Sequence, residues 1–170
     1  MRLAVLKERR PAETRVSATP ETVKKYKGLG LAVAVETGAG GPSGITDAAF
    51  AEAGAEIAPD AAAALNGSDI VLKVRAPLAA GEGEVDEVAL LPRGALLLGQ
   101  LGTEHAGAYA ERGVDAGAMD LLPRITRAQS MDILSSQANL AGFRAVIEAA
   151  AAYDRGFPML MTAAGTVPAA

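Results

Sequence analysis

A chain of 170 residues without cysteine cannot form disulfide bonds, thiolate metal sites or a thiol nucleophile. Half of the residues are hydrophobic but only 4% are aromatic, so we expect a core built mainly from Ala, Val, Leu and Ile. The net charge of −4 argues against a nucleic-acid-binding surface, for which a basic face is expected. No apolar run approaches the ~18 residues of a membrane span, and the N-terminus does not resemble a signal peptide.

Short apolar segments alternate with helical patterns along the first two thirds of the chain. We expect strands at residues 2–6, 31–35, 55–58, 69–74, 95–98 and 114–119. We expect helices at residues 20–26, 47–53, 60–65, 85–91 and 104–112, the first three with Thr19, Asp47 and Asp60 as N-caps. This alternation is typical of a parallel sheet with helices on both faces. The predicted fold class is therefore α/β, a three-layer Rossmann-like or flavodoxin-like domain with a mostly parallel sheet.

A longer helix is expected over residues 137–153, where the apolar residues share one face: Leu140, Phe143, Val146, Ile147 and Ala150. At about 1.5 Å per residue this helix would form an arm of roughly 25 Å, which needs a second surface to pack against. The following segment, FPMLMTAAGTVPAA, is predicted to lead into another strand. The chain is thus divided into an α/β domain at residues 1–136 and a connecting helix with its lead-in at residues 137–170.

Charged loops should meet at one edge of the predicted sheet. In parallel sheets, ligands bind outside the carboxyl ends of the strands, where the loops at residues 7–15, 73–75 and 124–132 begin. Four cations of this edge could cradle an anion, or could be solvated loop charges: Lys7, Arg15, Lys73 and Arg75. The residue types alone leave both possibilities open.

Two other features carry little functional signal. The glycine-rich segment at residues 38–44 lacks the dinucleotide fingerprint, because Ser43 stands at its sixth position and Pro42 interrupts it, so we predict a turn. His105 is the only histidine and is predicted to be a surface residue. A single histidine without a cysteine or carboxylate cluster is a poor metal site, so no metal is expected.

The most distinctive segment is PRITRAQSMDILSSQANLAGFRAV, at residues 123–146. It holds more polar side chains than a simple connection needs: Arg124, Arg127, Gln129, Asp132, Ser135, Ser136, Gln137 and Asn139. It could be a solvated loop and a helix N-terminus capped by Ser135 or Ser136. Alternatively, it could bind a planar amide and sugar hydroxyls. A site without His, Cys or metal suits hydride transfer, in which the protein holds two rings close together and the cofactors supply the chemistry.

Within this segment, RAQSMDILSSQANLAGFRAV closely resembles the nucleotide-contacting loop of the NAD(H)-binding subunit of proton-translocating nicotinamide nucleotide transhydrogenase. The resemblance covers the whole chain, through LKERRPAETRVSATPETVKKYKGLG, VETGAG, ITDAAFAEAGAEI and MTAAGTVPAA. It implies catalytic positions at Arg124, Gln129 and Asp132, which with Ser135 would contact the nicotinamide ends of the cofactors. Arg124, Asp132 and Ser135 would face NAD(H) on this subunit, and Gln129 would reach NADP(H) on a partner subunit.

The same resemblance implies the setting of the protein. Its partners would be NADP-binding and membrane-spanning transhydrogenase subunits and a second copy of itself. Its location would be cytoplasmic, at the cytoplasmic face of a bacterial inner membrane. In the family, a Rossmann domain with a glycine fingerprint follows MTAAGTVPAA, so residues 137–170 would lead into an NAD-binding domain outside this sequence. These 170 residues alone are expected to bind NAD(H) weakly or not at all, and to be inactive.

Two alternatives stay open. The first is an alanine dehydrogenase, a family with the same N-terminal architecture. Arg15 and Lys73, in TRV and LKV, fall where that family binds the carboxylate of its 2-oxo acid, but Gln100 stands where its catalytic histidine is expected. The second is a non-catalytic interaction module that uses the apolar stripe of the last helix, formed by Leu140, Phe143, Ile147 and Ala150.

Overall fold

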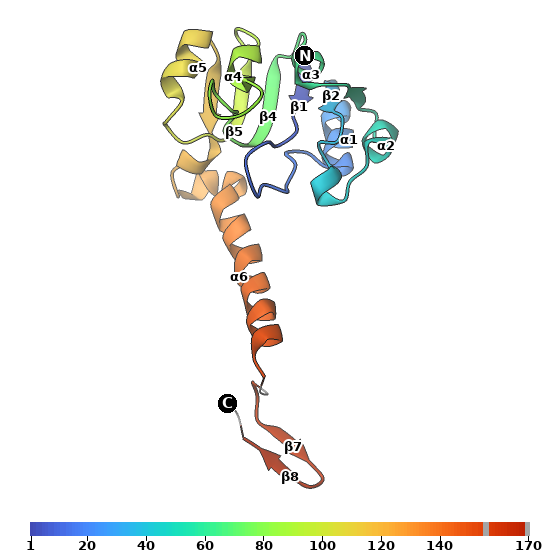
Figure 1. The fold of residues 1–170 in the computed structure, drawn as a ribbon, viewed down its shortest axis with the longest axis vertical. Coiled ribbons are helices and arrows are strands. Elements are labelled where there is room, and N and C mark those ends of the chain that lie inside the picture. Colours follow the sequence, from blue (N-terminus) through green and yellow to red (C-terminus); the bar gives the residue numbers. More distant parts are fainter. Residues whose placement is uncertain (155–156, 169–170) are drawn as a thin grey trace.

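The structure is a computed structural model that describes residues 1–154 and 157–168. It consists of an α/β domain, a long helix that leaves this domain, and a small hairpin beyond the helix (Figure 1). None of the helices in the described part of the chain combines the length and apolar character needed to cross a membrane.

The sheet of the domain has six parallel strands. They are β1 (Arg2–Val5), β2 (Ala32–Glu36), β3 (Glu56–Ala58), β4 (Ile70–Arg75), β5 (Leu96–Gln100) and β6 (Asp115–Ala118). Their order is β3-β2-β1-β4-β5-β6, so the chain first builds outward on one side of β1 and then crosses to the other side. This is the Rossmann order, and the switch point lies between β1 and β4. The predicted α/β class is confirmed, and of the two predicted topologies the chain adopts the Rossmann-like one.

Helices cover both faces of the sheet, as predicted. They are α1 (Pro20–Gly28), α2 (Asp47–Glu52), α3 (Ala61–Leu65), α4 (Glu87–Leu90) and α5 (Ala106–Arg112). On one face Val23 of α1 and Phe50 of α2 pack in a cluster with Val33 of β2. On the other face, α3, α4 and α5 contribute side chains to a second cluster, which includes Leu65 and Leu97. Alternating strand residues supply both clusters, which explains the continuous apolar runs in the sequence.

The predicted N-cap Asp47 is wrong, and neither serine considered as a cap for the last helix is used. In α2 the capping residue is Thr46, whose side chain accepts a hydrogen bond from the Ala49 amide. Asp47 instead accepts hydrogen bonds from the Thr37 hydroxyl at 2.6 Å and the Gly38 amide at 2.9 Å, and so holds the glycine-rich turn. The last helix, α6 (Ile133–Ala152), begins four residues earlier than predicted, with Asp132 rather than a serine as its N-cap. The predicted domain boundary after residue 136 therefore falls inside α6.

Helix α6 extends away from the sheet and buries none of its side chains (Figure 1). The predicted apolar face is exposed, with Phe143 69% and Ile147 42% accessible to solvent. Beyond α6 the chain forms an antiparallel hairpin of β7 (Leu160–Thr162) and β8 (Gly165–Val167), where a lead-in to a single strand was predicted. Residues 155–156 and 169–170 of that predicted segment lie outside the described residues.

Candidate functional site

The predicted nucleotide loop connects β6 to α6 at the carboxyl edge of the sheet (Figure 1). It contains two short 3-10 helices, η2 (Met119–Leu121) and η3 (Thr126–Met131). The structure brings all four predicted site residues to one cavity of about 200 Å³. Its lining consists of Leu122, Pro123, Arg124, Ile125, Ala128, Gln129, Asp132 and Ser135. This volume is below the roughly 300–1,000 Å³ of a site that encloses a whole ligand, so the cavity suits one end of a larger molecule.

Asp132 and Ser135 form a fixed pair at the start of α6. The Asp132 carboxylate accepts hydrogen bonds from the Ser135 amide at 2.9 Å and from its hydroxyl at 2.6 Å. The hydrogen bond from the Ser135 hydroxyl, together with that from its amide, lowers the pKa of Asp132 below its usual range, and Arg124 adds a weaker effect. Asp132 is therefore an ionised acceptor at neutral pH, in a position set by the helix N-terminus.

Arg124 and Gln129 differ from this pair, because both side chains are exposed and open to a ligand. The guanidinium offers only donors, whereas the amide offers donors and an acceptor. Ala128, which lies between them in the sequence, is buried. The cavity thus combines donors, an ionised acceptor and a hydroxyl. A set of this kind can bind a polar group that carries both donors and acceptors.

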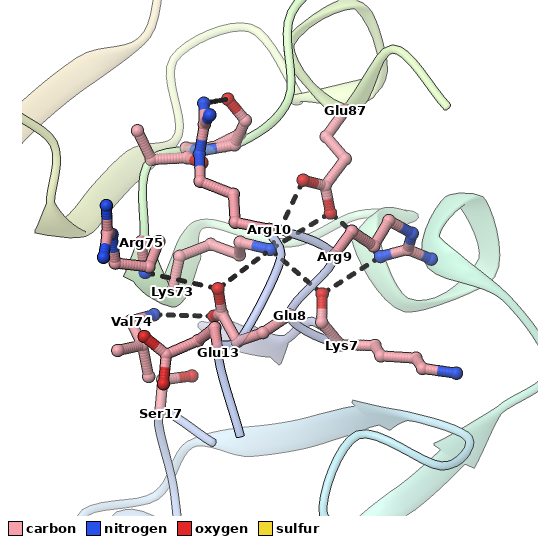
Figure 2. A network of polar contacts seen from close by, with 12 residues as sticks. Lys7, Glu8, Arg9, Arg10, Glu13, Ser17, Lys73, Val74, Arg75 and Glu87 are labelled. Atoms are coloured by element: carbon pink, nitrogen blue, oxygen red, sulfur yellow. Dashed lines mark hydrogen bonds and ion pairs between the residues drawn. The ribbon is translucent and has the colours of Figure 1, made fainter. Parts of the chain in front are cut away.

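The four cations considered as an anion cradle are not all open to a ligand. Lys7 and Arg75 are exposed, but Lys73 is buried in an ionic cluster at the switch point (Figure 2). The Lys73 ammonium donates to the Lys7 carbonyl oxygen at 2.9 Å and to Glu87 at 3.1 Å, and lies 3.5 Å from Glu8. Arg9 bonds the same Glu87 at 2.9 Å and also pairs with Glu36. Lys73 and Arg9 are therefore engaged by internal carboxylates.

The carboxylates of the cluster also bind the backbone. Glu8 accepts from the amides of Val74 at 2.7 Å and Arg75 at 3.2 Å, which fixes the loop after β1 against the end of β4 (Figure 2). Burial raises the pKa of Glu8, although Lys73 and the two amides act in the opposite direction. Sequence analysis did not identify Glu8 or Glu87. Glu8 lies in the charged segment KERR, whereas Glu87 lies in the distant segment VDEVAL.

Arg15 is likewise held by an internal carboxylate. Its guanidinium donates to Glu13 at 2.7 and 2.6 Å, and its remaining terminal nitrogen donates to the Gln137 side chain of α6 at 3.1 Å. Arg15, Lys73 and Gln100 line a second cavity of about 420 Å³, so the three residues of the alanine dehydrogenase alternative do lie together. Both cations of this cavity are already paired with carboxylates.

His105 is half-buried rather than a surface residue. It lies 3.4 Å from Glu82 and 3.5 Å from Arg10, in a polar cavity of about 590 Å³ that Gln100 and Asp120 also line. Among residues 1–154 and 157–168, no group of three or more His, Cys, Asp or Glu side chains is arranged to hold a metal ion.

Comparison with known proteins places this geometry in a family. The family model described as alanine dehydrogenase/PNT, N-terminal domain, matches residues 4–141. An NAD(P) transhydrogenase alpha-subunit chain of Rhodospirillum rubrum is 56% identical over 174 residues, an alignment that covers all of this chain and 45% of that protein. A crystal structure of transhydrogenase from Sinorhizobium meliloti superimposes with a TM-score of 0.88 at 48% identity, over all of this chain and 50% of that one.

A solved L-alanine dehydrogenase is also similar, with a TM-score of 0.63 at 31% identity, over 71% of this chain and 32% of that chain. The chain spans about half the length of the two transhydrogenases that it matches. The segment matched by the family model includes residues of all six strands of the sheet. It also includes the loop that carries Arg124, Gln129, Asp132 and Ser135. The chain therefore belongs to the alanine dehydrogenase/PNT N-terminal domain family.

Proposed function

We propose that this chain is the N-terminal portion of the NAD(H)-binding subunit of a proton-translocating NAD(P) transhydrogenase. In this function the subunit holds NADH so that hydride passes to NADP on a partner subunit. One observation carries the proposal. Arg124, Gln129, Asp132 and Ser135 line a single cavity at the carboxyl edge of the sheet, in a chain that is 56% identical to a transhydrogenase subunit.

The residues of the cavity fit the nicotinamide end of the cofactor. A carboxamide presents one carbonyl acceptor and one NH₂ donor, which match the Arg124 guanidinium and the ionised Asp132 carboxylate. Ser135 holds Asp132 in place through its 2.6 Å hydrogen bond. Gln129 is exposed at the rim of the cavity, where it can reach the cofactor of a partner subunit.

The nicotinamide itself supplies the hydride chemistry when bound. The task of this chain is to orient the ring, since direct transfer between two carbons requires the reacting atoms within about 3–3.5 Å of each other. Arg124 and Asp132 would fix the plane of the carboxamide and hence the face of the ring that meets the partner. No general acid or nucleophile is needed for this step.

The proposal includes the setting of the family. The partners would be the NADP-binding and membrane-spanning subunits, together with a second copy of this subunit, and proton translocation would occur in the membrane-spanning subunit. The subunit would lie at the cytoplasmic face of a bacterial inner membrane. The adenosine and pyrophosphate of NAD(H) would bind a Rossmann domain outside these 170 residues. Calorimetry with NADH on the 170 residues alone should accordingly show weak binding or none.

The test is a matched pair of substitutions in the complete native protein with its partner subunits. Arg124→Ala removes a donor from the cavity, whereas Arg127→Ala removes an exposed arginine of the same loop that does not line it. Loss of one charged hydrogen bond to the cofactor should raise the KM for NADH about tenfold or more. Equal effects of the two substitutions would contradict the proposed site.

The alanine dehydrogenase alternative rests on the second cavity, which contains Arg15, Lys73 and Gln100. Binding of a 2-oxo acid there would have to compete with Glu13 for Arg15 and with Glu8 and Glu87 for Lys73. Oxidation of NADH that depends on pyruvate, measured on the complete protein, would favour this alternative over the transhydrogenase.

A further inference from the structure

A carboxylate at the start of the nucleotide loop ties that loop to the sheet. Asp120 lies in η2, directly after β6. Its Oδ1 accepts a hydrogen bond from the Leu101 amide at 2.9 Å, and its Oδ2 accepts one from the Gly102 amide at 3.2 Å. Leu101 and Gly102 are the two residues that follow β5, so one side chain joins the ends of two neighbouring strands.

These two amides need such a partner. The pairing of β5 with β6 ends before Leu101, which is only 2% exposed, so its amide requires an internal acceptor. Gly102 has a φ of +58°, which turns its backbone away from the direction of the strand. A carboxylate that accepts from both residues supplies charge-assisted hydrogen bonds, which are roughly twice as strong as neutral ones.

The loop itself has few other attachments. Its cavity begins at Leu122, two residues after Asp120, and most of the residues that line it are exposed. Ala128 is its one buried residue in the described structure, and Asp132 fixes its far end to α6. Asp120 is therefore the polar anchor at the entry of the loop. Its hydrogen bonds determine where the chain leaves the sheet and hence where Arg124 is presented.

We infer that Asp120 is a positioning residue for the nucleotide-contacting loop, acting through its paired hydrogen bonds to the amides of Leu101 and Gly102. The inference rests on the proposed function, because it concerns the same cavity. Asp120 does not line that cavity, and its hydrogen bonds go to Leu101 and Gly102 rather than to the residues that the proposed function assigns to the cofactor. Its effect on hydride transfer is indirect, through the position and order of residues 122–132.

The experiment compares three variants of the complete native protein, assembled with its partner subunits. Asp120→Ala removes both acceptors, and Asp120→Asn keeps one oxygen that can still accept from Leu101. Asp115→Ala is the matched control, since it removes an exposed carboxylate from the neighbouring strand β6. Each variant is measured for hydrogen exchange of residues 122–132, for KM and kcat with NADH and NADP, and for melting temperature.

We expect Asp120→Ala to speed hydrogen exchange of the loop and to raise the KM for NADH about tenfold, the loss that corresponds to one charge-assisted hydrogen bond. The kcat at saturating NADH should fall less than the KM rises, because bound cofactor itself helps to order the loop. Asp120→Asn should recover part of both effects, and Asp115→Ala should match the unsubstituted protein.

Two results would overturn the inference. One is that Asp120→Ala and Asp115→Ala have the same rate of hydrogen exchange in residues 122–132 and the same KM for NADH. The other is a lower melting temperature with both loop readouts unchanged, which would mean that Asp120 only supports the fold. Failure of the proposed function is a separate result, namely an unsubstituted protein that transfers no hydride. In that case, hydrogen exchange of the loop alone decides whether Asp120 positions it.

Discussion

Lys73 has a buried ammonium group whose charge is satisfied entirely from within the domain. Its side chain is 1% exposed and lies within 3.5 Å of two carboxylates, Glu8 and Glu87. Removing one partner from such a cluster leaves the remaining charges desolvated and unpaired, which costs more than the ion pair contributes. The lysine therefore matters for stability more than an ordinary surface lysine does.

Replacement of this lysine should be strongly destabilising. We expect Lys73→Met to lower the free energy of unfolding by ~3–5 kcal/mol. The control is Lys25→Met, which breaks the exposed pair with Glu21 and should cost at most ~1 kcal/mol. Urea denaturation of the two variants measures both values, and similar losses would show that the buried cluster has no special role.

Two acids of the loop after β1, Glu13 and Glu8, should change the free energy of unfolding in opposite directions as the pH rises. The hydrogen bond from Arg15 lowers the pKa of Glu13 below 4.5, so the unfolded chain binds more protons between the folded pKa and 4.5. The stability from Glu13 is therefore complete above pH 4.5 and is lost as the pH falls through the folded pKa. Burial raises the pKa of Glu8, so its contribution declines as the pH rises above 4.5.

Substitution with glutamine separates the two acids. The stability difference between the unsubstituted protein and Glu13→Gln should be largest above pH 4.5 and should shrink in acid. With Glu8→Gln, the decline of stability just above pH 4.5 should become weaker. Denaturation midpoints measured from about pH 3 to about pH 7 test both. A difference for Glu13→Gln that stays constant with pH would contradict the assigned hydrogen bond.

At the scale of elements, the strands and most helices could be predicted from hydrophobic periodicity and turn residues. The errors lie at helix starts where more than one residue can cap. Thr46 and Asp47 both have suitable side chains, and the choice depends on Thr37 and Gly38, which occupy Asp47. No local pattern contains that information, because the partners belong to another segment of the chain.

The candidate site likewise has one part that could be predicted from the sequence and one part that could not. The convergence of Arg124, Gln129, Asp132 and Ser135 could be predicted, because all four lie within one loop and one helical turn. The ionic cluster could not, since Arg9 and Glu87 are 78 residues apart and Lys73 meets a carbonyl 66 residues away. Asp120 was missed for the same reason, with its partners 19 and 18 residues earlier in the chain.

At the scale of the whole molecule, the domain has the Rossmann strand order, and an ionic cluster occupies its switch point. The ends of β1 and β4, where a Rossmann sheet binds its nucleotide, are joined by Lys73, Glu8 and the loop after β1 (Figure 2). The cavity of the predicted nucleotide loop lies instead beyond the edge strand β6. This position of the cavity is consistent with the proposed function, in which this domain holds only the nicotinamide end of the cofactor.

The apolar face of α6 gives a prediction for the molecule as a whole. The exposed fractions of this stripe are 61% for Leu140, 69% for Phe143, 67% for Val146 and 42% for Ile147. A contiguous exposed apolar surface of this kind usually marks an interaction site. The 170 residues should therefore associate in solution through this face. Burial of a large apolar side chain contributes ~1.5–3 kcal/mol, so Phe143→Glu with Ile147→Glu should weaken association about a hundredfold or more.

Light scattering over a range of concentrations measures this association. The control is Arg144→Ala, which changes an exposed side chain of the same helix that pairs with Glu148 and leaves the apolar stripe intact. Association that survives the double substitution would locate the contact elsewhere, for instance on the hairpin, where Met161 is 82% exposed. A monomer at every concentration, before and after the substitution, would exclude self-association through α6. Self-association would then give no support to the alternative that the chain is a non-catalytic interaction module.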